Sequence, residues 1–221
     1  MRKSLVCCGL GIFVGLSVTA FAGAQEAAER GRTQGIKETE KFIKTGGQTS
    51  EAVAKAKLQT QKTLDAYNTL VTQPTSNMKG DYKSLMKNMD AMNARVAEAK
   101  QKVDLMQQAA DTYFTGRAET IKNIQNQDLQ DRAKQRMTES QKQFEGVLQS
   151  LRAGAQELEP FRKDLADQIT YLGSDLTPSA MTSLKPNADK LNAQGTVIFE
   201  KTDKAIGTAN AYFEGLRASE S

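Results

Sequence analysis

The sequence lacks histidine and tryptophan, and its two cysteines, Cys7 and Cys8, stand close to its beginning. If the chain loses this N-terminal segment, disulfides, thiol nucleophiles and imidazole chemistry are all excluded. Prolines number only four, while Ala, Gln, Lys, Glu and Leu dominate. These residues favour helix and few prolines interrupt it, so the composition predicts helix throughout.

The first 24 residues have the three parts of a secretory signal peptide. A basic pair at 2–3 precedes an apolar stretch at 5–18, and small residues follow up to Ala22 and Ala24. We expect cleavage after Ala22 or Ala24, which makes the mature protein periplasmic or secreted. An uncleaved anchor is the alternative, because the uncharged run at 4–25 could cross about 30 Å of hydrocarbon. In that case the protein would associate with the membrane only through its uncleaved leader.

Positive and negative charges nearly cancel in this sequence. The whole chain has 30 basic and 26 acidic residues, a net charge of +4, and loss of Arg2 and Lys3 lowers it to +2. Proteins that bind the phosphate backbone concentrate Lys and Arg on one face. No nucleic-acid partner is therefore expected.

The strongest pattern is an apolar seam that advances alternately by four and three residues. Such a 3.5-residue repeat on a helix of 3.6 residues per turn is typical of long helices that pack side by side. Similar but weaker stripes run through 53–71, 144–172 and 184–216, and they include Ala56, Ala155 and Ala205. The members of the strongest seam are Met78, Tyr82, Leu85, Met89, Met92, Val96, Ala99, Val103, Met106, Ala110 and Tyr113.

Turn and capping residues divide the chain into helical segments. We predict helices over 48–73, 76–124, 127–172 and 178–217, with Asn126 or Asp128 and then Thr177-Pro178 as starts, and a kink rather than an end at Pro160. The three later segments are long enough to reach roughly 60 to 70 Å each. Long helices joined by short turns fold back on one another, so we expect an all-α, elongated antiparallel bundle of three to four helices over 48–217. Gly46-Gly47 is expected to separate this bundle from a polar lead-in of low order or weak helix at 25–45, and 218–221 is expected to be a disordered tail.

Three groups of residues are candidates for chemical sites. Ser84 and Lys87 match the Ser-x-x-Lys pair of penicillin-binding enzymes, and 44–46 spells their Lys-Thr-Gly, but the order is reversed and no strand is predicted. Met86, Met89 and Met92 could present thioethers to Cu(I), although Met89 and Met92 already belong to the seam.

The third group consists of carboxylate pairs, Asp164 with Asp167 and Glu157 with Glu159. They could perform acid-base chemistry only if burial separated their pKa values, and the lysine and arginine between them indicate a solvated helix face. We therefore expect no catalytic residue, no metal ligand and no cofactor.

Residues 171–184, YLGSDLTPSAMTSL, carry a family resemblance together with Ala66-Tyr67-x-x-Leu70 and Asp81-Tyr82-x-x-Leu85. The chain resembles the bacterial family called domain of unknown function 2959 over most of 48–217. The resemblance implies a secreted or envelope-associated, largely helical protein of unestablished activity. It supplies no catalytic residues.

These observations favour a non-enzymatic structural or interaction protein of the bacterial envelope, which binds an unknown envelope protein through its helix faces or bundle ends and which could form oligomers. The alternative is a periplasmic holdase chaperone for unfolded envelope proteins. An enzyme is disfavoured, because a chain without its leader would have no histidine and no cysteine.

Overall fold

The computed structural model describes residues 18–219, with side chains from residue 33 onward. This part of the chain folds into four helices and contains no strand, which confirms the all-α prediction. The helices are α1 (Val18–Thr72), α2 (Met78–Lys122), α3 (Gln127–Ser174) and α4 (Pro178–Ala218). Most of the predicted signal peptide lies outside the described residues. No helix in the described range has a stretch long and apolar enough to cross a membrane.

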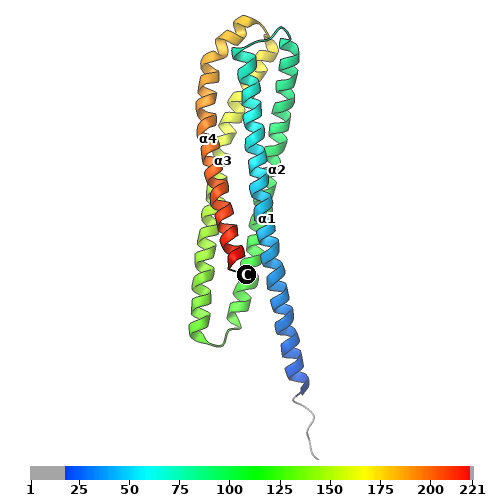
Figure 1. Cartoon of the computed structure of the whole chain (residues 1–221), viewed down its shortest axis with the longest axis vertical. Helices are drawn as coiled ribbons and strands as arrows, with labels where there is room; N and C mark the ends of the chain where they lie inside the picture. Colours follow the sequence, from blue (N-terminus) through cyan, green and yellow to red (C-terminus); the bar gives the residue numbers. More distant parts are fainter. Residues whose placement is uncertain (1–17, 220–221) are drawn as a thin grey trace, which may run out of the picture.

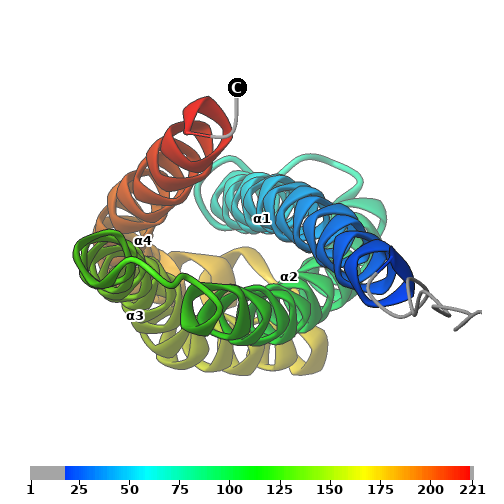
Figure 2. The same ribbon diagram turned by 90° about the horizontal axis from the view of Figure 1, so that it is seen from below.

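The four helices form an up-and-down bundle (Figure 1). Each helix packs against its neighbours in the chain, and α4 closes the ring by packing against α1 (Figure 2). We call the end that carries the loops 73–77 and 175–177 the upper end, and the end that carries the loop 123–126 the lower end. The first turns of α1 extend beyond the lower end (Figure 1). The elongated antiparallel bundle predicted from the seams is therefore present.

The helix starts follow the capping signals in the sequence. The Asn126 side-chain oxygen accepts a hydrogen bond from the Leu129 amide at 3.1 Å, and Pro178 follows the cap Thr177, whose hydroxyl accepts from the Ala180 amide at 3.3 Å. A side-chain oxygen at this position satisfies an amide that has no partner within the helix. Both predicted starts are confirmed.

The predicted separation at Gly46-Gly47 is wrong, because α1 runs through both glycines without interruption. The predicted lead-in also contributes to the core of the bundle, since Phe42 is completely buried there. A polar segment becomes a stable helix here because it lies against α2 and α4, and packing outweighs the low helix propensity of two glycines. At the other end of the chain, Ala218 belongs to α4, and residues 220–221 of the predicted tail lie outside the described range.

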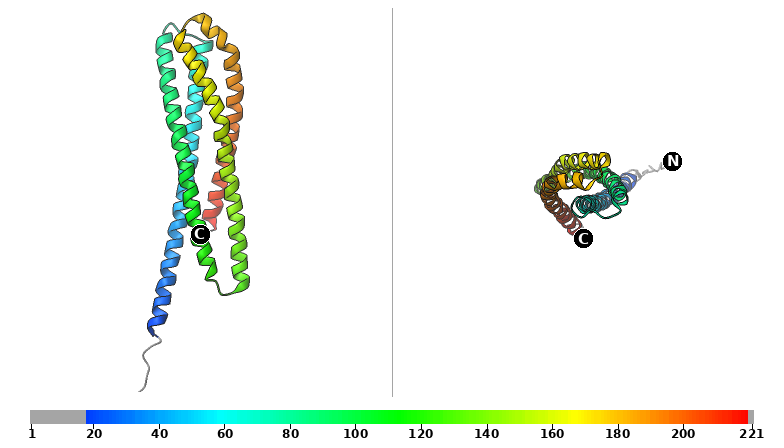
Figure 3. Two further views of the ribbon diagram at one scale, coloured as in Figure 1. Left: turned by 180° about the vertical axis from the view of Figure 1, so that it is seen from behind. Right: turned by 90° about the horizontal axis from the view of Figure 1, so that it is seen from above.

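Two prolines lie inside helices. α3 continues through Pro160, so the helix does not end there, and the kink at this residue stays a prediction. Pro186 lies inside α4, whose first part is inclined to the rest of the helix at the upper end (Figure 3). Proline removes one amide donor and crowds the preceding turn, which is the usual cause of such a bend.

The predicted seam of α2 lies in the core: eight of its eleven residues are buried, and Met78, Tyr82 and Val103 are half-buried. The apolar side chains of the bundle divide into two clusters. The upper cluster surrounds Tyr67, Leu85 and Leu165, and the lower cluster surrounds Phe42. Half-buried Val53 packs against both.

Buried threonines join α1 to α2. The Thr49 hydroxyl donates to the backbone carbonyl of Lys102 at 2.9 Å, and the Thr63 hydroxyl donates to that of Asn88 at 3.1 Å. Both hydroxyls also lie within hydrogen-bond distance of carbonyls in their own helix. Small hydroxyl side chains allow the two helices to approach closely while their polar atoms stay bonded.

Candidate functional site

The sequence candidates for chemistry do not come together. Ser84 and Lys87 are exposed on α2 beside the upper cluster, whereas residues 44–46 are helical and lie beside the lower cluster on α1. The strand and the converging geometry that penicillin-binding enzymes need are not present in these segments. The match to their motifs is therefore a coincidence of sequence.

The three methionines divide between core and solvent. Met92 is fully buried and Met89 nearly so, both within the upper cluster, while Met86 is exposed. A Cu(I) site would need the thioethers to point at a common place. Core packing explains Met89 and Met92, and Met86 does not join them. Among the described residues, no group of three or more His, Cys, Asp or Glu side chains could hold a metal ion.

The carboxylate pairs lie on solvated helix faces, and three of their four carboxylates have a cationic partner. Lys201 binds Glu157, and Lys190 approaches Asp164 to 3.5 Å. Arg162 and Lys100 both contact Glu159, at 2.9 and 3.3 Å, and the nearby Arg162 charge is the main reason that the pKa of Glu159 is lowered. A general acid needs the opposite shift. These groups therefore behave as surface ion pairs.

Six aromatic rings, with Phe42 at their centre, lie within the lower cluster, and we call them the aromatic cluster. The Phe42 ring centroid lies 5.2 Å from that of Tyr113, 5.0 Å from that of Phe144 and 5.1 Å from that of Phe213. Ring pairs at such distances, stacked or edge to face, stabilise a core beyond the area that they bury. The rings come from all four helices, so this cluster is where α1 and the end of α4 are fixed to the rest. The remaining two rings are Phe114 and Tyr212.

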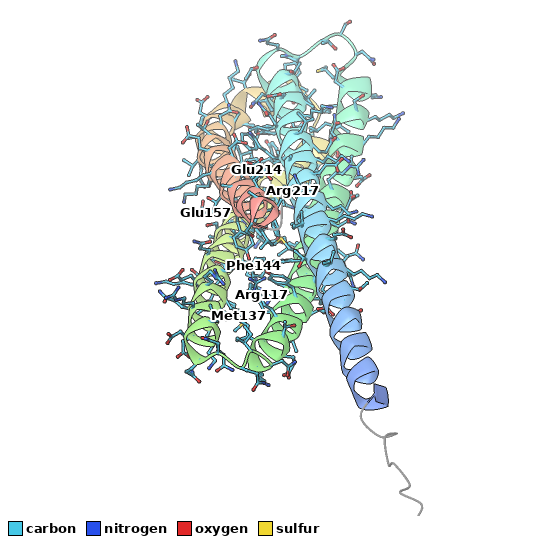
Figure 4. The ribbon with its side chains drawn as sticks, turned by 60° about the horizontal axis from the view of Figure 1, so that its bottom comes forward. Arg117, Met137, Phe144, Glu157, Glu214 and Arg217 are labelled. Carbon is cyan, nitrogen blue, oxygen red and sulfur yellow. The ribbon has the colours of Figure 1, made fainter. Side chains whose placement is uncertain are left out.

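Below the aromatic cluster, α4 ends while the other three helices continue. Figure 4 shows Arg117 and Met137 between α2 and α3 beyond the end of α4, which carries Glu214 and Arg217. Among the described residues, no helix fills the fourth position of the bundle there. We call the surface that α1, α2, α3 and the end of α4 leave at this place the lower hollow.

The lower hollow consists of two adjoining depressions of about 280 and 350 Å³, which share Tyr113, Arg117 and Arg136. The larger one is lined by α1, α2 and α3 without any residue of α4. Ile36 lines the larger depression, and Leu129 lies on α3 one turn before Ala133, which also lines it; the exposed fractions of Ile36 and Leu129 are 55% and 54%. Exposed apolar side chains beside a depression are typical of interaction sites.

A second cavity, of about 170 Å³, lies between the upper and lower clusters and is lined by all four helices. We call it the waist cavity. Small residues on every helix create it, because none of them reaches the centre of the bundle: Ala56, Ala99, Gly154, Ala155 and Ala205. The larger apolar residues around it include Val53, Val96, Leu158 and Ile198.

The polar side chains of the waist cavity that are buried or half-buried have partners. The hydroxyls of Thr60 and Thr202 donate to carbonyls of their own helices, at 2.8 and 2.7 Å. The Lys57 ammonium binds Asp203. The interior therefore offers an apolar surface with no hydrogen-bonding group waiting for a ligand.

The family model described as "Protein of unknown function (DUF2959)" matches residues 28–216. The chain belongs to the DUF2959 family. This match begins inside the segment that had been predicted to be a lead-in and extends almost to the end of α4, in agreement with one continuous bundle. No curated protein and no solved structure matches the chain.

Sequence reasoning missed both the lower hollow and the waist cavity. The alanines of the waist were visible as weak members of the apolar stripes, but nothing in the sequence indicated that they lie at one height. The lengths of the segments were also visible, but the relative shift of the helices along the bundle axis was not. Both features depend on how helices align with one another.

Proposed function

We propose that this DUF2959 protein is a non-enzymatic interaction protein of the bacterial envelope, exported by its leader, and that a partner protein binds at the lower hollow. The observation that carries the proposal is the larger depression of the hollow, which is lined by residues of α1, α2 and α3, has exposed Ile36 in its lining, and has exposed Leu129 one turn before its lining residue Ala133. An amphipathic helix of the partner fits this place, because it can continue the bundle in the way that α4 does above.

The chemistry of the lower hollow suits a partner helix with an apolar stripe flanked by carboxylates. Apolar atoms of Ile121, Ile124 and Ala133 line the larger depression and offer a surface for the stripe. Arg136 is exposed and lines both depressions, so its guanidinium can meet a carboxylate of the partner. Glu38 and Glu139 keep the hollow from being uniformly basic, which disfavours a phosphate-rich ligand.

The ionisable groups of residues 33–219 support the proposal that the protein is not an enzyme. Two tyrosines in this range, Tyr67 and Tyr212, have strongly raised pKa values, and burial is the main cause for each. The hydrogen-bond partners of these phenols are not bases: Tyr67 binds the Gln168 side-chain amide, and Tyr212 lies 3.0 Å from the Ser140 hydroxyl. A catalytic serine or tyrosine generally needs a base beside it.

Site-specific photocrosslinking in intact cells tests the docking site. A photoreactive residue in place of Leu129 should form an adduct with one envelope protein, whereas the same residue in place of exposed Ser76 at the upper end should not. With the photoreactive residue kept at position 129, the double substitution Ile36→Glu and Arg136→Glu changes the apolar and charged surface of the hollow without touching a buried residue, so it should leave the helix content unchanged and abolish the adduct.

The same material distinguishes the chaperone alternative. A holdase suppresses aggregation of many unfolded envelope proteins, and its adducts would form a broad smear. A single partner band that survives in a strain without envelope stress supports the docking proposal. Equal adducts from positions 76 and 129, or an adduct that persists in the double variant, would contradict it.

A further inference from the structure

The waist cavity is an unusual feature for a bundle built on apolar seams. Seam positions normally carry large aliphatic side chains that fill the space between helices. Here one or more small residues from each of the four helices face the same volume of about 170 Å³. There is room for an added side-chain carbon at Gly154, because the carbon would meet only the Thr202 hydroxyl, at 4.0 Å.

We propose that the waist cavity is a binding site for a small apolar molecule, of the size of benzene or of a short alkyl chain. Its volume is close to that of an engineered apolar cavity of about 150 Å³ that stays dry and takes up benzene. The polar groups inside are already bonded within the protein, so the recognition rests on shape and on apolar contact. This inference is independent of the partner site at the lower hollow.

The entry to the cavity lies between α2 and α3. The lining residues that are exposed come from these two helices, and they are Lys100, Asp104, Ser150 and Arg152. On the side of α1 and α4, the lining residues Lys57 and Phe199 are half-buried and close the cavity. A ligand can therefore enter with its apolar part inward while a polar end stays among the charged side chains at the surface.

The charged side chains Lys100 and Arg152 at this entry are held only by exposed surface contacts. Lys100 lies 3.3 Å from Glu159, and the Arg152 guanidinium donates to the Gln107 side-chain oxygen at 3.2 Å. Exposed pairs of this kind contribute little free energy, so the entry opens at small cost. The binding step needs only rotation of long surface side chains, which takes place on a fast time scale.

NMR titration of the methyl groups tests the proposal, with benzene and 1-octanol as the probes. In the wild-type protein, methyl signals of Val53, Val96 and Ile198 should shift in a saturable way. Leu184 and Met181 lie in the upper cluster but do not line the cavity, and their methyl signals are the internal control. No saturable shift with either probe up to its solubility limit would overturn the proposal.

A pair of substitutions on α3 shows where the probe binds. Ala155 lines the cavity, and Ala155→Leu fills it; the exposed Ala153 is nearby on the same helix, and Ala153→Leu is the matched control. We expect Ala155→Leu to raise the thermal midpoint and to abolish the saturable shifts, and Ala153→Leu to keep them. Equal shifts in the two variants would place the probe elsewhere and end the proposal. Should Ala155→Leu fail to fold, Ala99→Leu fills the same space from α2.

Discussion

The ring of Phe213 on α4 lies over the backbone of Gly46 on α1, in the place that a side chain at position 46 would occupy. Phe213 is buried, and its ring also meets Phe42 edge to face at 5.1 Å. The glycine therefore serves the contact between two helices and not a turn or a linker. The next residue differs completely, because a side-chain carbon added to Gly47 would meet nothing within 4 Å.

Alanine substitutions at these two glycines should have effects of opposite sign. Gly46→Ala forces the Phe213 ring out of its place and should lower the free energy of unfolding by about 1–3 kcal/mol. Gly47→Ala introduces a better helix former at an open position and should raise it by about 0.5–1 kcal/mol. Urea denaturation followed by circular dichroism measures both. A stabilising Gly46→Ala would mean that α4 does not pack on α1 at this height.

Phe42 ties the first part of α1 to the bundle, so its removal should cost far more than the removal of an exposed residue. Phe42→Ala should lower the free energy of unfolding by about 3–5 kcal/mol, because it empties the centre of the aromatic cluster. Leu58→Ala on the same helix is the control: Leu58 is 53% exposed, and its loss should change stability by less than about 0.5 kcal/mol. Similar effects for the two variants would contradict the packing of residues 33–45.

The sequence was a good guide to α2, α3 and α4, because their seams repeat regularly and their ends carry Asn126, Thr177 and Pro178. It did not predict that α1 continues through Gly46 and Gly47, because few apolar residues mark a buried face before them and paired glycines are typical of linkers. A single phenylalanine at position 42 does not predict the centre of an aromatic cluster, because the five other rings are distant in sequence and meet Phe42 only after the helices have aligned.

The candidate sites were harder to predict than the fold, for a related reason. Ala56, Ala99, Ala155 and Ala205 all stood in the apolar stripes, yet an alanine in a stripe usually means only close packing. Whether four such residues face one cavity depends on the relative shift of four helices along the bundle axis. Packing of large side chains such as Phe42 and Leu165 fixes that shift, and local sequence does not encode it.

The leader should be removed during export. Mass spectrometry of the protein isolated from its native host should give a mature chain that starts at residue 23 or 25, because small residues precede both positions. The mature protein should then be found in the soluble periplasmic or secreted fraction. Substitution of Ala22 and Ala24 by a bulky residue such as leucine should retain the leader and move the protein to the membrane fraction. Retention of residues 1–24 in the wild-type protein would support the anchor alternative.

Two buried tyrosines should make the bundle sensitive to alkaline pH. Tyr67 is completely buried and Tyr212 is half-buried, and burial raises the pKa of each to about 12 from the ordinary value of 10.0. In this interval the unfolded chain has lost the phenol protons and the folded chain keeps them. The contribution of these two phenols to the free energy of unfolding should therefore be constant below about pH 10 and should fall as the pH rises towards 12.

Tyr67→Phe isolates this effect. The variant loses the hydrogen bond to Gln168, which lowers stability equally at all pH values, and it also loses one titrating group. Its free energy of unfolding should thus decline less steeply above pH 10, by up to about 1.4 kcal/mol per pH unit, than that of the wild type. Urea denaturation at about pH 8 and about pH 11 measures the difference, and the double variant with Tyr212→Phe should flatten the decline further. Parallel profiles for the wild type and Tyr67→Phe would show that this phenol is hydrated in the folded protein, and Tyr67 would then not belong to a dry core between α1 and α3.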